Sequence, residues 1–230
     1  MGGIILTNGC QVVHVPSYLV GLWKACKKAS NNEIEWVTVK VSEGATEWQS
    51  ILSDFDSVVL AAGSGLFHSN LIDNLPITLV RGQSLEIDLT EESSARPFEA
   101  VLCGKYISPI KPGKILIGAT HEYKAESLSK DEVTDALRER SYDLSPVAWD
   151  RGVIKRVTSG WRVQSERGAL GRLPIVGRIS DKSNTWIFTG LGSRGLIHHG
   201  IYGKLLAESI FSEDDVLLQK NLPHVYWWRK

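Results

Sequence analysis

A glycine-rich segment near the C-terminus offers the clearest chemistry in this chain. Residues 185–189 are typical of a strand, residues 190–195 form a turn rich in glycine, and residues 196–211 are typical of a helix. Glycine lets a backbone approach a ligand closely. The first turn of a helix presents unpaired N–H groups and a partial positive charge. The segment could therefore hold an anionic or electron-rich group, although a purely structural turn of an α/β protein has the same pattern.

The elements that must position this turn alternate between helix and strand. Apolar residues at helical spacing follow Pro16 and predict a helix to about residue 29. A second helix is predicted over residues 131–142, capped at Ser129. Strands are predicted over residues 34–41, 57–62, 79–89, 100–107, 114–120 and 153–161, and the apolar run at 57–62 is typical of a buried parallel strand. Periodicity alone indicates a mixed α/β protein.

Composition and net charge argue against some classes of function. The chain has 230 residues, with 26 basic and 26 acidic side chains and no formal net charge. Neutral charge gives no electrostatic reason to expect a nucleic-acid or membrane partner, and no apolar run is long enough to span a bilayer. The three cysteines, Cys10, Cys26 and Cys103, fit neither a disulfide framework nor a metal site, so we predict reduced core thiols. This favours the cytoplasm or the interior of an organelle.

Five segments, taken in order, resemble one family. They are residues 56–65, 79–85, 106–109, 115–122 and the Gly-Leu-Gly-Ser-Arg-Gly-Leu run at 190–196. Together they resemble the FAD-dependent D-amino-acid-oxidase-like superfamily, which includes glycine oxidase and sarcosine oxidase. The run at 190–196 is most similar to the flavin turn in the C-terminal oxidase domain of the bifunctional tRNA wobble-uridine modification protein.

The resemblance implies a fold and a domain layout. The expected class is α/β, with a partial FAD-binding Rossmann-like layer interleaved with a mostly antiparallel substrate-domain sheet. The FAD-binding part would comprise residues 15–72 and 158–230, and the substrate sheet residues 1–14 and 73–157. Family members begin with a Gly-x-Gly-x-x-Gly turn for the FAD pyrophosphate, and no such turn lies near residue 1. We therefore expect the C-terminal part of a longer oxidoreductase, one that retains little FAD by itself.

The resemblance also implies roles for particular residues. Arg162 would be the catalytic residue that binds the substrate carboxylate, because a guanidinium pairs both oxygens of such a group. Here a valine follows it, where the family has proline. Tyr106 and Glu122 are further candidates for the substrate pocket. The expected FAD contacts are Gly63, Arg81, Gly82, Gly190, Gly192, Ser193, Arg194, Gly195 and Leu196. For each of these residues, a structural turn or a solvated side chain is the alternative.

The implied activity is oxidation of a small amine or amino acid by hydride transfer to FAD, with no metal. Two alternatives stay open. The chain could be a non-catalytic truncated form that binds no FAD, or an oxidase that acts on a modified tRNA base.

Overall fold

The computed structural model describes residues 9, 11–39, 50, 53–68, 72, 74–90, 99–124, 126–181, 183–222 and 224–229. Contacts divide the chain into two compact units. The first contains residues 1–39, 82–121 and 126–159, and the second contains residues 40–81, 122–125 and 160–230. The expected mixed α/β class is confirmed, since the chain builds a small mixed sheet and a five-stranded antiparallel sheet.

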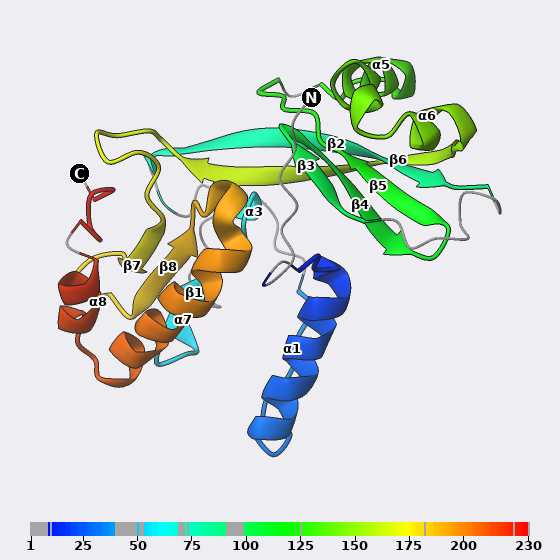
Figure 1. The fold of residues 1–230 in the computed structure, drawn as a ribbon. Helices are drawn as coiled ribbons and strands as arrows, with labels where there is room; N and C mark the ends of the chain where they lie inside the picture. The colour runs from blue at the N-terminus through cyan, green and yellow to red at the C-terminus, as the bar shows by residue number, and fades with distance from the viewer. Residues whose placement is uncertain are drawn as a thin grey trace. The chain divides into compact units, whose positions relative to one another are not determined.

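The five-stranded sheet has the order β3-β4-β5-β2-β6 (Figure 1). Its strands are β2 (Ile77–Asp88), β3 (Val101–Cys103), β4 (Lys105–Lys111), β5 (Lys114–Gly118) and β6 (Val153–Ser165). The strands predicted at 79–89, 114–120 and 153–161 are confirmed. β6 runs four residues beyond its predicted end, to Ser165.

Two helices cover one face of this sheet (Figure 1). α5 (Lys130–Ser141) and α6 (Pro146–Arg151), joined by the short helix η1 (Tyr142–Leu144), bury Leu137 and Trp149 against the strand residues Leu85 and Ile107. α5 begins as predicted, because the Ser129 hydroxyl accepts a hydrogen bond from the backbone N–H of Glu132 and the Glu132 carboxylate accepts one from the Ser129 N–H. This reciprocal capping satisfies two N–H groups that the helix leaves unpaired.

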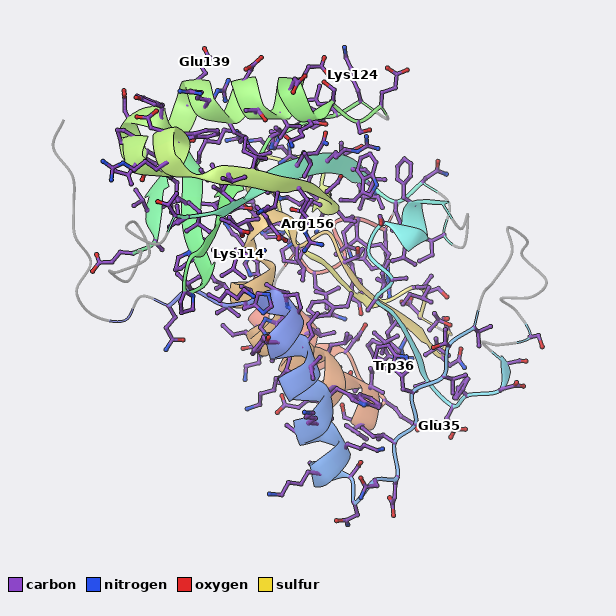
Figure 2. All side chains as sticks on the ribbon, turned by 90° about the vertical axis from the view of Figure 1, so that its right-hand side faces the viewer. Glu35, Trp36, Lys114, Lys124, Glu139 and Arg156 are labelled. Carbon is purple, nitrogen blue, oxygen red and sulfur yellow. The ribbon has the colours of Figure 1, made fainter. Side chains whose placement is uncertain are left out.

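Charged side chains lie together on the β2, β5 and β6 part of this sheet. Lys114 and Arg156, both labelled in Figure 2, flank Glu86. The Arg156 guanidinium donates to Glu86 at 2.5 Å and holds the pKa of that carboxyl below its ordinary value of 4.5. Lys114 lies 3.7 Å from the same carboxylate and 3.2 Å from Asp88.

Three predictions in the first unit need correction. Gly104, at a φ of 66°, breaks the strand predicted at 100–107 into β3 and β4, which pair antiparallel. Residues 34–39 form no strand, and they pair with no other strand in the described part of the chain. Val41 lies outside that part.

The described cysteines are exposed rather than core thiols. Cys26 lies on a helix with no buried side chain, and Cys103 lies on the edge strand β3. Cys10 lies outside the described residues. α1 (Val15–Ala29) is confirmed, and Asn31 and Asn32, both at positive φ, follow its end.

The second unit contains a three-stranded sheet in the order β1-β8-β7 (Figure 1). β1 (Val58–Leu60) pairs parallel with β8 (Thr185–Thr189), which pairs antiparallel with β7 (Ile175–Arg178). β1 is parallel, as predicted for residues 57–62, but it is shorter and Val59 is 42% exposed. The helices of this unit include α3 (Gly65–His68), η2 (Gly192–Arg194), α7 (Gly195–Phe211) and α8 (Val216–Asn221).

The core of the second unit forms around β7 and β8. Ile175 and Ile187 bury against Leu60 and Trp228, while Trp186 belongs to a cluster with side chains of α7 and α8. These contacts fix the end of β8, from which the glycine-rich turn leaves. Among the described residues, no helix is long and apolar enough to cross a membrane.

Candidate functional site

Two glycine turns lie at the same edge of the three-stranded sheet. β1 and β8 are parallel, and Leu60 pairs with Ile187. Three residues after each paired position the chain reaches Gly63 and Gly190, at φ values of 55° and 71°. Ligands of open α/β sheets bind at the carboxyl ends of parallel strands. The two turns expected to approach FAD therefore share the edge where a ligand is expected.

The turn after β8 leads directly into the start of a long helix. Gly190 and Gly192 both have positive φ, a conformation that glycine adopts at no steric cost. A Cβ at Gly190 would also lie 3.4 Å from the Ile175 side chain. α7 follows with Arg194 as N-cap, no side-chain cap and no acidic residue in its first turn. The positive end of α7 is thus not compensated by its own side chains, which suits an anionic ligand.

A cavity of about 310 Å³ opens beside this turn. Gly190, Leu191, Gly192 and Ser193 line it together with four cationic or titratable side chains, Arg167, Arg172, Arg194 and His198. Burial and the nearby Arg194 lower the pKa of His198 below its ordinary 6.5. Among the described residues, none of the three arginines forms an ion pair with a carboxylate. The cavity is therefore a region of positive potential.

The end of β6 borders the cavity. Gln164 is buried, lines the cavity and forms an isolated bridge with Leu191. Its side-chain amide donates to the Tyr123 hydroxyl at 3.5 Å. Arg162 lies two residues earlier in β6 and so shares a strand face with Gln164. Arg162 is half-buried but does not line the cavity.

Arg81 and Glu122 face each other across a short bridge. The N–H of each donates to the carbonyl of the other, at 2.8 and 2.9 Å. The Arg81 guanidinium lies 4.4 Å from the centre of the Trp161 ring, at a cation–π distance. Both carboxylate oxygens of Glu122 are buried and accept no hydrogen bond from the described residues. An unpartnered buried carboxylate is costly, so Glu122 is available to a ligand that donates N–H groups.

Several other predicted site residues do not line this cavity. Gly195 and Leu196 begin α7 but do not line it. Gly82 and Tyr106 belong to the first unit, where the Tyr106 hydroxyl lies 3.0 Å from the Ser84 hydroxyl. A Cβ at Gly82 would lie 3.5 Å from the Ala119 side chain. Their roles stay predictions.

Sequence reasoning missed several cavity residues, namely Gln164, Arg167, Arg172 and His198. The Glu-Arg-Gly-Ala-Leu-Gly-Arg run at 166–172 carried the available signal, since two arginines flank a glycine turn. No group of histidine, cysteine or acidic residues in the described chain could hold a metal ion.

Comparison with known proteins identifies the family of this chain. The family described as FAD dependent oxidoreductase (DAO) matches residues 1–209. The tRNA 5-methylaminomethyl-2-thiouridine biosynthesis bifunctional protein MnmC of Nitrosospira multiformis is 31% identical over 164 residues, covering 65% of this chain and 25% of that protein. Glycine oxidase of Pseudomonas aeruginosa is 28% identical over 165 residues, covering 70% and 43%.

Solved structures show the same fold. Glycine oxidase from Bacillus cereus matches with a TM-score of 0.56 at 20% identity, covering 71% of this chain and 44% of that chain. Iminodiacetate oxidase from Chelativorans sp. BNC1 matches with a TM-score of 0.55 at 20% identity, covering 70% and 43%. The chain spans less than half the length of each of these proteins.

Glycine turns at the carboxyl edge of a parallel strand pair, beside an uncompensated helix start, are typical of α/β proteins that bind nucleotides or flavins. Within that class, the chain belongs to the DAO family of FAD-dependent oxidoreductases.

Proposed function

We propose that the chain contributes the flavin-end and substrate residues of an enzyme that oxidises a carboxylate-bearing amine or amino acid. The observation that carries the proposal is the placement of the turns at Gly63 and Gly190 on one sheet edge, next to the start of α7. Family membership supports FAD as the cofactor.

The residues at this edge fit the flavin end of FAD. Gly190 and Gly192 leave room for close approach, and the start of α7 with Arg194 provides positive potential. Gly63, at the end of β1, would approach the ADP half of the cofactor. FAD, when bound, supplies the chemistry of hydride acceptance, and positive potential beside the flavin favours the reduced, anionic form. Ser193, Gly195 and Leu196 belong to the same turn and helix start, while Arg81 and Gly82 stay proposed contacts.

Arg162 and Glu122 would hold the two ends of the substrate. Arg162 binds the carboxylate through the two parallel N–H donors of its guanidinium. Glu122 accepts hydrogen bonds from the substrate amine, because its two buried oxygens have no partner among the described residues. Together they orient the carbon–hydrogen bond that is to be broken, and Tyr106 is retained as a proposed pocket residue.

The experiment is anaerobic reduction of FAD added to the purified chain, followed as loss of the oxidised flavin absorbance. We expect reduction by amines that carry a carboxylate, and none by the matching amines without one. Tight FAD binding without reduction by any amine would contradict the proposed activity. Absence of FAD binding would support the non-catalytic alternative.

A second candidate is oxidation of a modified tRNA base. It is favoured by the 31% identity to the tRNA-modifying MnmC protein of Nitrosospira multiformis. Reduction of FAD by a tRNA carrying a modified wobble uridine, and not by small amines, would favour this candidate. The neutral charge of the chain favours the small-molecule amine.

We also propose the domain division of the sequence analysis, with residues 15–72 and 158–230 in the FAD-binding part and residues 1–14 and 73–157 in the substrate part. The proposed location is the cytoplasm or the interior of an organelle.

A further inference from the structure

Three neighbouring strands place a pair of hydroxyls on the face of the five-stranded sheet that α5 and α6 do not cover. β4, β5 and β2 lie side by side in that order (Figure 1). Tyr106 of β4 is directly opposite Gly118 of β5, and the register of β5 with β2 brings Ser84 to the other side of the same glycine. Ile107 and Ile117 pack against the helices, and the residues that alternate with them along each strand point to the other face.

Gly118 leaves room for the two side chains to meet above β5. The hydroxyls of Tyr106 and Ser84 are 3.0 Å apart, although β5 lies between their strands. A Cβ at Gly118 would lie 2.5 Å from the Tyr106 hydroxyl and closer still to the Ser84 hydroxyl. Any other residue at this position would therefore displace the pair.

Burial decides which of the two hydroxyls donates the hydrogen bond. Ser84 is only 6% exposed, and among the described residues its hydroxyl is hydrogen-bonded to that of Tyr106 and to no other group. Thr158 donates to the backbone carbonyl of Ser84, at 3.4 Å, and not to its side chain. If Tyr106 donated, the Ser84 O–H would be buried without an acceptor, which is costly. Ser84 therefore donates and Tyr106 accepts.

Tyr106 keeps its own O–H for another group. Its side chain is only half-buried, so the phenolic proton is accessible on the open face of the sheet. The hydrogen bond from Ser84 occupies one lone pair of the phenolic oxygen and so restricts the directions in which the proton can point. A hydroxyl that accepts one hydrogen bond is also polarised and donates another more strongly.

We propose that Ser84 is a positioning residue for Tyr106. It donates to the phenolic oxygen and thereby directs the Tyr106 O–H toward a hydrogen-bond acceptor on the substrate, such as a carboxylate oxygen. Tyr106 contacts the substrate, and Ser84 acts only through Tyr106. The assignment rests on the proposed function for the placement of Tyr106 in the substrate pocket.

The first test determines the state of the Tyr106 hydroxyl in the purified chain without FAD. The intensity ratio of the tyrosine Raman doublet separates a phenol that accepts a hydrogen bond from one that only donates, and the difference spectrum against Tyr106→Phe isolates this tyrosine. We expect Ser84→Ala to remove the accepting character and Ser84→Thr to restore it, because threonine keeps the hydroxyl. Thr158→Val is the matched control, since it removes the hydroxyl that bonds to the Ser84 carbonyl and should leave the Tyr106 signal unchanged.

The second test measures binding of acetate, which supplies a carboxylate as the probe. We expect acetate to increase the donating character of the Tyr106 signal in a saturable way. Ser84→Ala should weaken acetate binding by about two- to tenfold, the scale of one neutral hydrogen bond. In the Tyr106→Phe background the same substitution should have no further effect, because the two residues act as one unit.

Four results would overturn the proposal. They are a Ser84→Ala spectrum that keeps the accepting character of Tyr106, an equal spectral change in Thr158→Val, an acetate titration that leaves the Tyr106 signal unchanged, and an undiminished effect of Ser84→Ala in the Tyr106→Phe background. If Ser84→Ala fails to fold by circular dichroism, the parent spectrum decides, since the proposal requires Tyr106 to accept a hydrogen bond there. Neither test uses FAD or turnover. A chain that passes both tests but reduces no FAD with any amine would contradict the proposed oxidation and leave the role of Ser84 unchanged.

Discussion

At the residue scale, the sequence predicted which charged side chains are candidates for the site better than it predicted which groups they contact. Arg162 and Glu122 were predicted from the family resemblance, and the structure places Trp161 of the Arg162 strand against Arg81, which pairs with Glu122. The unsatisfied oxygens of Glu122 had no sequence signal, because a side chain's hydrogen-bond partners depend on tertiary contacts.

Arg162→Lys should lower kcat/KM for carboxylate-bearing amines by about 1–3 kcal/mol in transition-state free energy, the scale of one charge-assisted hydrogen bond. Lysine keeps the charge but loses the two-pronged geometry that orients the substrate. The measurement is steady-state kinetics on matched amines with and without a carboxylate, with FAD added to saturation, together with the affinity for FAD. A loss of FAD, or an equal loss on both kinds of amine, would show that Arg162 does not bind the carboxylate.

Glu86 makes a pH-dependent contribution to the free energy of unfolding. The hydrogen bond from Arg156 lowers the folded-state pKa of Glu86 below 4.5, so the folded state favours the carboxylate. This stability is present above the unfolded-state value of 4.5 and is lost as pH falls through the folded-state pKa.

We therefore expect Glu86→Gln to lower the free energy of unfolding at neutral pH and to lower it less at about pH 3. Urea unfolding at the two pH values measures the difference. Glu139→Gln is a suitable control, because Glu139 is exposed and labelled on the outer side of α5 in Figure 2. A Glu86→Gln effect that does not change with pH would contradict this assignment.

At the element scale, local signals predicted the helices α1, α5 and α7 and most strands. The short helices α3, α6 and α8 were missed, and the wrong strand predictions depended on long-range pairing. Ser129 caps α5 and β8 spans the predicted residues, because both depend on signals within a few residues. Residues 34–39 alternate as a strand does but lack a paired neighbour in the described chain. Gly104 ends β3 because a hairpin requires its positive φ, and a lone glycine within an apolar run gives only a weak signal of that turn. The cavity likewise depends on the glycine turn within residues 166–172 meeting a helix start, which no local pattern predicts.

The cap of α5 gives a quantitative prediction at this scale. Ser129→Ala should reduce the free energy of unfolding by about 1 kcal/mol, since it removes the acceptor for the Glu132 N–H. Ser129→Asp should retain most of the stability, because aspartate is an equally good N-cap residue. Chemical unfolding of the three proteins measures this, and equal stability of the alanine and aspartate variants would contradict the role of the cap.

At the scale of the whole molecule, each unit exposes apolar surface. In the second unit, β1 pairs only with β8 among the described strands, and its Val59 is 42% exposed. In the first unit, α1 has no buried residue, and Leu19 and Val20 are 57% and 55% exposed. An isolated 15-residue helix is marginal in water, and parallel strands are normally covered on both faces. The exposed surfaces therefore favour association.

We expect the purified chain to self-associate as its concentration rises, and Val59→Lys to reduce this association. A lysine on an exposed edge strand opposes pairing with another strand because the charge must stay hydrated. Val147→Lys is the matched control, since Val147 is 48% exposed but lies on α6 rather than on a strand edge. Size-exclusion chromatography with light scattering across a concentration series measures the mass of each protein. A parent chain that is monomeric at every concentration would contradict the expectation. An equal reduction of self-association in both variants would show that added charge, rather than the β1 edge, controls the association.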